Sequence, residues 1–304
     1  MDAAIVTRTL AKRFGASTAL DELDLVVPVG GVFGFLGPNG AGKTTTIRLL
    51  LDLIRPTSGT VSVLGLDPRR DGVALRSRIG YLPGALDLPP RLSGRDFLAD
   101  QAALRRRRLD AEVKVLAERL DADLDRPMGE LSLGNRRKVG MIAAFAPRPD
   151  LLLLDEPTGG LDPLVQQTFR SLAREVVADG RTVFLSSHVL DEVQHVADSV
   201  AVLREGRLVA EGRIETLIAQ LVRTFRVRFD DVAAPPPEPA RLADVPGVVA
   251  VRSFDGEAEI EIDVEGAAGA LLAVLATLRP TDLHCSEADL EDFFLGYYGE
   301  RAPS

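Results

Sequence analysis

The chain has 304 residues, 46% of them hydrophobic, and a formal net charge of −9. Its length and composition predict a globular protein with one large domain and a smaller one. The acidic balance argues against nucleic acid as the main partner, because phosphate backbones are bound by clustered lysines and arginines.

The chain shows no signal for secretion or for crossing a membrane. No apolar run approaches the roughly 20 residues that a transmembrane helix needs, and the N-terminus lacks a basic-then-apolar leader. The single cysteine, Cys285, cannot form an internal disulfide and is expected to be a buried thiol. We therefore expect a cytosolic protein whose membrane association, if any, comes from a partner.

From residue 1 to about 218, short β-branched apolar runs alternate with helical segments and glycine-rich junctions, which predicts an α/β domain with a largely parallel sheet. Strand signals stop between Pro89 and Pro127, where helix starts at Ser93 and Asp110 predict a helical insert, a subdomain of about 89–147. The arginine run 105–108 in this insert is expected to form the solvated face of a helix. Representative predicted strands are Val32–Leu36, Leu151–Asp155 and Thr182–Ser186.

Residues 219–304 are predicted to form a small α+β domain of different composition. They hold 7 basic and 16 acidic residues, which accounts for the whole net charge of −9. A proline-rich stretch at 235–239 indicates an extended loop. A strand follows in which Ala258, Ile260, Ile262 and Val264 alternate with acidic residues, so one face should be buried and one acidic. Helices are predicted over 271–278 and 290–298.

The segment from Gly37 to Thr44 fits the phosphate-binding loop pattern and lies between a predicted strand and a predicted helix. Its glycines let successive backbone N–H groups point at phosphate oxygens, and the helix N-terminus adds positive potential. Lys43 can reach the β and γ phosphates, and Thr44 offers a hydroxyl ligand for Mg²⁺. The residues predicted to bind nucleotide here are Gly37, Pro38, Asn39, Gly40, Ala41, Gly42, Lys43, Thr44 and Thr45.

Two carboxylates, Asp155 and Glu156, end a fully apolar strand, which is costly unless their charges have a role. Asp155 is predicted to hold Mg²⁺ or its water. Glu156 is predicted to orient the attacking water or accept its proton. His188 follows another strand and can contact the γ phosphate and the water.

Together with these motifs, four more segments make residues 1–218 resemble the ATP-binding cassette family of P-loop NTPases. Phe14 matches the aromatic residue that stacks on adenine, and Leu131–Asn135 matches the LSGGQ signature. Gly159–Asp162 matches the D-loop, and Ser187-His188 the switch histidine. The resemblance implies that the signature loop, with Ser132 and Gly134 near the γ phosphate, completes the ATP site of the opposite chain, and that Asp162 of the D-loop also binds nucleotide. It therefore implies a face-to-face dimer, formed with a second copy or with a similar cassette.

The tail resembles, through residues 289–299, the tails of ATP-binding subunits in exporters of the ABC-2 type. This implies an ATPase on the cytoplasmic face of the membrane that drives a separate transmembrane permease. Two departures stand out. Gly84 occupies the position where the family usually has glutamine, and Leu133 and Asn135 replace glycine and glutamine in the signature.

Two other functions are compatible with these motifs. A soluble cassette ATPase acting on ribosomes or DNA would usually carry two cassettes or a long coiled-coil insert, and neither is present. A regulator with slow or no turnover is suggested by Gly84, whereas the presence of Glu156 and His188 argues against it.

Overall fold

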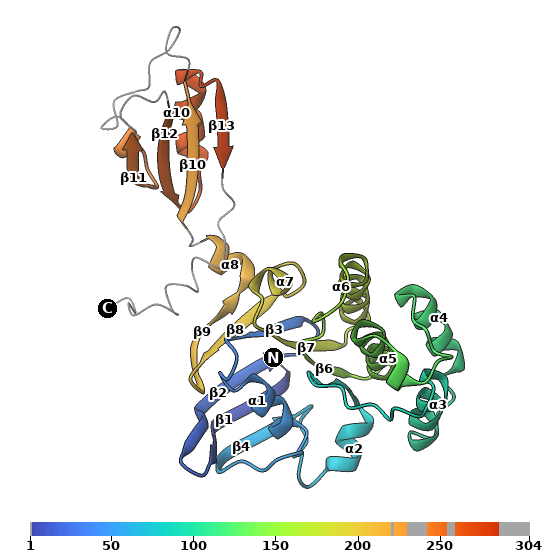
Figure 1. Ribbon diagram of the computed structural model, residues 1–304. Coiled ribbons are helices and arrows are strands. Elements are labelled where there is room, and N and C mark those ends of the chain that lie inside the picture. The colour runs from blue at the N-terminus through green and yellow to red at the C-terminus, as the bar shows by residue number, and fades with distance from the viewer. Residues whose placement is uncertain (1, 220–221, 230–241, 254–258, 286–304) are drawn as a thin grey trace. The chain divides into compact units, whose positions relative to one another are not determined.

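The computed structural model describes residues 2–219, 222–229, 242–253 and 259–285. The chain divides into two compact units, Met1–Gly212 and Arg213–Ser304, called unit 1 and unit 2 below (Figure 1). The proline-rich stretch at 235–239 and the helix predicted over 290–298 lie outside the described residues.

Unit 1 is built around a six-stranded sheet of order β5-β6-β7-β3-β8-β9. Strands β3, β6 and β7 are buried throughout and pair in parallel, as their unbroken apolar sequences predict, and β8 pairs with β3 in the same direction. Two of the predicted strands are confirmed to the residue, and β7 is one residue longer than predicted. The strands are β3 (Val32–Leu36), β5 (Ile79–Leu82), β6 (Leu151–Asp155), β7 (Thr182–Ser187), β8 (Ser199–Arg204) and β9 (Arg207–Arg213).

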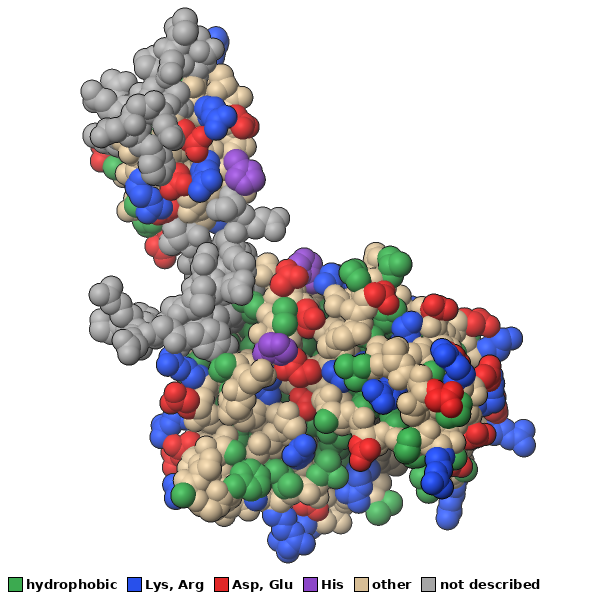
Figure 2. Space-filling view, in the orientation of Figure 1, with side chains coloured by type: hydrophobic (Ala, Val, Ile, Leu, Met, Phe, Trp, Pro, Cys, Tyr) green, Lys and Arg blue, Asp and Glu red, His purple; other side chains and the backbone are tan. Residues whose placement is uncertain are grey.

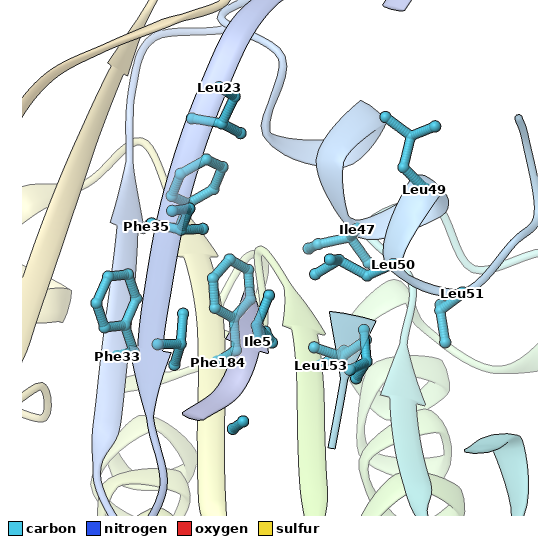
Figure 3. Packing of buried hydrophobic residues seen from close by; sticks show 14 of the residues in the cluster. Ile5, Leu23, Phe33, Phe35, Ile47, Leu49, Leu50, Leu51, Leu153 and Phe184 are labelled. Atoms are coloured by element: carbon cyan, nitrogen blue, oxygen red, sulfur yellow. The ribbon is translucent and has the colours of Figure 1, made fainter. Parts of the chain in front are cut away.

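A second sheet in unit 1, which the sequence analysis did not predict, is antiparallel and has the order β2-β1-β4. It consists of β1 (Ala3–Phe14), β2 (Ser17–Pro28) and β4 (Ser58–Val63). Buried residues of β1 and β2, such as Ile5 and Leu23, share one core with β3, β7 and helix α1 (Lys43–Leu50). In that core the rings of Phe33 and Phe184 stack with centroids 5.9 Å apart (Figure 3).

This packing fixes the helix that follows the phosphate-binding loop. Ile47 and Leu50 of α1 are fully buried in the same cluster as Leu153 of β6. Removing such a side chain costs about 2–5 kcal/mol, so α1 and the loop before it are held firmly against the sheet. The remaining helices of unit 1 outside the insert are α2 (Gly72–Ser77), α6 (Pro163–Ala178) and α7 (Leu190–Gln194), and α8 (Ile214–Ala219) lies at the start of unit 2.

The predicted insert is helical, with α3 (Gly94–Leu104), α4 (Asp110–Leu120), the short 3₁₀ turn η1 (Met128–Glu130) and α5 (Leu133–Phe145). Ser93 caps α3 by accepting a hydrogen bond from the Asp96 backbone N–H, as its position predicts. Helix α5 packs against β5 on one side and against α3 and α4 on the other (Figure 1). It therefore joins the insert to the sheet.

The arginine run 105–108 is not helical as expected, although Arg106, Arg107 and Arg108 are exposed as a solvated face would be. The run forms the turn after α3 instead of a helical face, because Arg106 adopts a left-handed backbone with φ of 53°. Arg105 is half-buried and donates to the Ile79 carbonyl at 3.1 Å, and Arg107 donates to the Pro147 carbonyl. Arg105 thereby ties the insert to β5 of the sheet, which periodicity alone does not reveal.

Unit 2 contains a four-stranded antiparallel sheet of order β11-β12-β10-β13. Helix α10 covers one face, where Leu271 and Leu275 pack against Ile260, Ile262 and Val264. The alternating strand and the helix predicted over 271–278 are thus confirmed within the described residues. The elements are β10 (Val222–Arg228), β11 (Val248–Ser253), β12 (Glu259–Glu265), α10 (Gly269–Leu278) and β13 (Asp282–Cys285).

The acidic face of β12 is paired with arginines of the neighbouring strands. Glu261 contacts Arg226 at 2.8 Å, and Arg252 reaches Asp263 at 2.6 Å. Glu259 pairs with Arg228 in the same way. On the face shown in Figure 2, acidic and basic side chains are likewise interspersed over both units. The paired charges keep this sheet face polar.

Cys285 is exposed, so the expectation of a buried thiol is wrong. It lies at the end of β13, whose described side chains are all exposed, because this strand is at the edge of the sheet. Within the described residues, none of the helices combines the length and apolarity that spanning a bilayer requires.

Candidate functional site

The phosphate-binding loop connects the end of β3, at Leu36, to the start of α1, at Lys43. Gly42 has a φ of 113°, and a Cβ there would lie 2.6 Å from the Ala19 carbonyl oxygen, so only glycine fits. Pro38 and Asn39 are exposed, and the Ala41 N–H closes the turn onto the Pro38 carbonyl at 3.1 Å. The loop therefore has the curled backbone that its sequence predicts.

Lys43 is nearly buried in the first turn of α1, with 6% of its side chain exposed. Its Nζ donates to the carbonyls of Gly37, at 2.5 Å, and Pro38, at 3.2 Å. It also lies 3.4 Å from Glu156 Oε1. The ammonium group is thus held between the loop and a carboxylate, where it can meet an anion that binds in the loop.

Asp155 ends β6 beside the loop because β6, β7 and β3 are adjacent parallel strands whose carboxyl ends share one edge. Its carboxylate is 1% exposed and accepts hydrogen bonds from Thr44 Oγ1, at 2.8 Å, and from the Ser186 hydroxyl. Thr45, next in α1, is half-buried. The predicted pair of metal ligands, Thr44 and Asp155, is therefore brought into direct contact.

Glu156 and His188 also lie together. His188 Nδ1 is 2.8 Å from Glu156 Oε2, and the Glu156 N–H donates to the Ser186 carbonyl at 3.1 Å. Glu156 has a φ of 50°, a left-handed backbone that is unfavourable for a residue with a side chain and typical of functional sites. With one carboxylate oxygen toward Lys43 and the other toward His188, Glu156 lies between two predicted phosphate contacts.

The signature and D-loop residues are placed differently. Ser132 caps α5, its exposed hydroxyl accepting from the Asn135 N–H at 3.1 Å. Asp162 caps α6 by accepting from the Val165 N–H at 3.0 Å. Within the described part of the chain, no hydrogen bond or ion pair joins them to Lys43 or Glu156.

The contacts of Gly134 and Asn135 show how the signature packs and what the variant residue Asn135 does. A Cβ on Gly134 would lie 3.0 Å from the Gly160 carbonyl oxygen, so the signature packs closely on the D-loop of the same chain. Asn135 uses both ends of its amide on the backbone of Asp123, at 2.8 and 3.0 Å. Asparagine here fastens the turn after α4 to α5, a role that motif comparison does not predict.

Phe14 is 52% exposed at the end of β1, and Lys12 Nζ lies 4.7 Å from its ring centroid. An exposed ring of this kind offers a flat surface for a planar ligand. It lies at the end of β1, in the sheet that shares a hydrophobic core with β3.

Sequence reasoning missed two residues that surround Glu156. Arg137 of α5 is 4% exposed and donates to the carbonyls of Gly84, Glu156 and Pro157. Burial lowers the pKa of Arg137, and the nearby carboxylates of Asp155, Glu156 and Glu192 oppose that shift. Arg137 stands in a run of charged residues that predicts an exposed helix face, so the local sequence does not predict its burial.

Glu192 of α7 is the second missed residue. Its carboxylate accepts hydrogen bonds from the hydroxyls of Thr158 and Ser187, the latter at 3.2 Å. It thereby joins the segment after Glu156 to the segment before His188, and helps to keep these two side chains together.

The arrangement combines a backbone cradle for phosphate, a lysine, two oxygen ligands for a cation, and a carboxylate paired with a histidine. Comparison with known proteins points the same way. The family model described as "ABC transporter" matches residues 20–159.

Three curated relatives are similar over most of their length. The daunorubicin resistance ATP-binding protein DrrA3 of Streptomyces coeruleorubidus is 41% identical, covering 72% of this chain and 71% of that protein. A Nod factor export ATP-binding protein I of Burkholderia lata is 35% identical, covering 78% of each. The daunorubicin/doxorubicin resistance ATP-binding protein DrrA of Streptomyces peucetius is 34% identical, covering 98% of this chain and 93% of its own.

Among solved structures, one titled as the ATP binding subunit of an ABC transporter superposes with a TM-score of 0.65 and 29% sequence identity. It covers 70% of this chain and 91% of its own. The matched share corresponds in size to unit 1, whereas the Streptomyces peucetius relative extends over nearly the whole chain.

Proposed function

This chain belongs to the ABC transporter family, and we propose that it is the ATP-hydrolysing subunit of an exporter, working as a face-to-face dimer on a separate membrane subunit. The observation that carries the proposal is the contact of Glu156 with both Lys43 and His188 at the edge where the phosphate-binding loop lies. ATPase activity follows from family membership. The dimer, the membrane subunit and the residue roles are the proposed part.

In the proposed mechanism, the loop N–H groups and Lys43 bind the β and γ phosphates, which neutralises charge that develops during transfer. Lys43 exchanges its carbonyl contacts at Gly37 and Pro38 for phosphate oxygens. Glu156 orients the attacking water and accepts its proton, while His188 holds the carboxylate and reaches the γ phosphate. Exposed Phe14 stacks on the adenine ring.

The residues present fit a magnesium ion. Thr44 Oγ1 and Asp155 Oδ2 are both hard oxygen ligands and lie 2.8 Å apart. The described residues hold no cluster of three or more side chains able to bind a metal alone, which suits an ion that takes its other ligands from phosphate and water. When bound, Mg²⁺ would offset phosphate charge and help align the nucleotide.

Gly84→Ala is expected to raise the Mg²⁺ concentration for half-maximal ATPase activity about tenfold. The added Cβ would lie 3.0 Å from Asp155 Oδ2 and 3.2 Å from its Cγ, and Thr44 and Ser186 already hold that carboxylate. A Mg²⁺ titration of the ATPase rate measures the shift. Gly269→Ala, which puts a methyl into open space, is the control. An unchanged Mg²⁺ requirement would contradict the assignment of Asp155.

The dimer proposal rests on the exposed N-terminus of α5. Ser132 and Gly134 are predicted to contact phosphate, yet within the described chain Ser132 has no bond to Lys43 or Glu156. We propose that they face the nucleotide held by the other chain, with Asp162 beside them at the start of α6. Two composite sites then close when ATP binds.

The membrane proposal rests on the names of the relatives and on the insert. One relative is named for export and two for drug resistance, and the chain covers most of each. A pocket between β5 and the insert is lined by Tyr81, Leu86, Phe97 and Gln101, and we propose that a side chain of the membrane subunit docks there. The chain would then lie on the cytoplasmic face of the membrane through that partner.

Capture of the tagged chain from detergent-solubilised membranes tests the partner, and an integral membrane protein of several spans is the expected companion. Recovery of ribosomes or DNA instead would favour a soluble cassette ATPase. A steady-state rate near zero with Mg²⁺ and ATP would favour a nucleotide-controlled regulator.

A chain shortened to end at Ala219 is expected to fold and to bind ATP with nearly the affinity of the full chain. All predicted nucleotide contacts lie in unit 1, and ending at Ala219 keeps β9 whole. Equilibrium titration with a fluorescent ATP analogue measures the affinity, with Lys43→Ala in the same shortened chain as the non-binding control. A folded shortened chain that fails to bind ATP would show that unit 1 is not independent.

A further inference from the structure

Arg137 is a buried cation whose hydrogen bonds all go to backbone carbonyls. Only 4% of it is exposed, and charged side chains are almost never buried to this extent without a specific partner. Its Nη1 donates to the Gly84 carbonyl at 2.8 Å, its Nε to the Pro157 carbonyl at 3.4 Å, and its Nη2 to the Glu156 carbonyl. The single guanidinium therefore hydrogen-bonds to the segment that follows β5 and to the segment that follows β6.

Two of these carbonyls belong to the strained stretch that presents the catalytic carboxylate. Glu156 has a φ of 50°, which an L-residue adopts only when surrounding contacts hold it there. Arg137 binds the carbonyl of this residue and that of the next. A Cβ on Gly159 would lie 3.2 Å from Nη2, so the same turn is shaped to leave room for the guanidinium.

The third carbonyl connects this contact to the departure at position 84. Gly84 follows β5 and its Cα lies beside the Asp155 carboxylate, where any side chain would be crowded. The family usually has a glutamine at this position. In this chain the loop has no such amide, and its Gly84 carbonyl instead accepts a hydrogen bond from the Arg137 guanidinium, which extends from α5. Arg137 therefore ties the Gly84 loop and the Glu156 turn to one helix.

We propose that Arg137 is a positioning residue that fixes the backbone of Glu156 and couples it to α5. The proposal rests on the function proposed above, in which Glu156 activates water. Ser132 caps the same helix that carries Arg137. In the proposed dimer, α5 would contact the partner's nucleotide at its N-terminus and hold the chain's own Glu156 less than two turns later. Closure on one nucleotide would then adjust the carboxylate at the other.

Arg137→Met tests the proposal in the full chain because it keeps an unbranched side chain in place of the aliphatic part of arginine and removes every donor. We expect kcat for ATP hydrolysis to fall about 10- to 100-fold, as for a misplaced catalytic group, with KM for ATP within about twofold. Arg137→Lys should give an intermediate loss, since an ammonium cannot serve three carbonyls with a fixed fork. The control is Lys138→Met, which removes only a bond to the Asp121 carbonyl.

Glu156→Gln separates positioning from general destabilisation. If Arg137 acts through Glu156, adding Arg137→Met to Glu156→Gln should lower the residual rate by less than about twofold, a strongly non-additive result. If Arg137→Met does not fold, Arg137→Lys carries the same comparison. Equal losses in both backgrounds, a rise in KM without a fall in kcat, or a parent-like rate in either Arg137 variant would overturn the proposal. Parent-like turnover by Glu156→Gln itself would instead reject the proposed function.

Discussion

Glu156→Gln is expected to lower the steady-state ATPase rate by about 10²- to 10⁴-fold while ATP still binds. The amide has the shape of the carboxylate and can keep the contact with His188, 2.8 Å away in the parent chain. It has no negative charge with which to accept a proton from water. The phosphate-binding loop and Lys43 are untouched, so nucleotide affinity should be retained.

Because chemistry is blocked after closure, ATP-dependent dimers should accumulate. Size-exclusion chromatography with ATP and Mg²⁺ measures them, next to the ATPase rate. Glu175→Gln is a suitable control, since it changes an exposed glutamate of α6 that pairs with Arg119 of α4, away from the site. Hydrolysis at the parent rate would remove Glu156 from the mechanism.

Ser132→Arg and Lys43→Ala should each abolish activity as homodimers but restore it when mixed. Lys43→Ala removes the charge-assisted contact to phosphate, and Ser132→Arg fills the space that faces the partner's nucleotide. In a mixed dimer one composite site carries both changes and the other is intact. Random pairing makes about half of the dimers mixed, so independent sites would return roughly a quarter of the parent activity.

Strict coupling between the two sites could hide this recovery, so ATP retention gives the decisive readout. With Glu156→Gln added to both chains, the mixture should trap ATP that neither homodimer retains, because trapping needs no turnover. Ser171→Arg places the same side chain on an exposed serine of α6 and serves as the control. Full ATPase activity of the Ser132→Arg homodimer would contradict the composite site and the face-to-face dimer.

The central strands and the loop could be predicted because their physical signals are local. Val32–Leu36 and Leu151–Asp155 are unbroken apolar runs since both of their faces are covered, and the glycine pattern at residues 37–42 reflects backbone angles that other residues avoid. Ser93 marks the start of α3 because its side chain caps the helix by accepting a hydrogen bond from the Asp96 N–H, three residues later. Such features are set by neighbours in sequence.

The features that sequence reasoning missed depend on distant contacts. Arg137 stands in a charged run and becomes buried only when α5 packs on β5 and the Glu156 turn closes over it. The partial burial of Arg105 against the Ile79 carbonyl likewise depends on a distant contact. The exposure of Cys285 follows from the edge position of β13, which a pattern within one strand cannot reveal.

The order of strands in the large sheet also sets when the nucleotide site can form during synthesis. β3, which leads into the phosphate-binding loop, pairs with β7 on one side and β8 on the other, and β8 ends at Arg204. A nascent chain that stops before Thr182 lacks both strands that pair with β3, and one that stops before Ser199 still lacks β8. Long-range pairing of this kind makes folding slow. We therefore expect that chains lacking β8 do not form the phosphate-binding loop, so that ATP binding requires the complete unit 1.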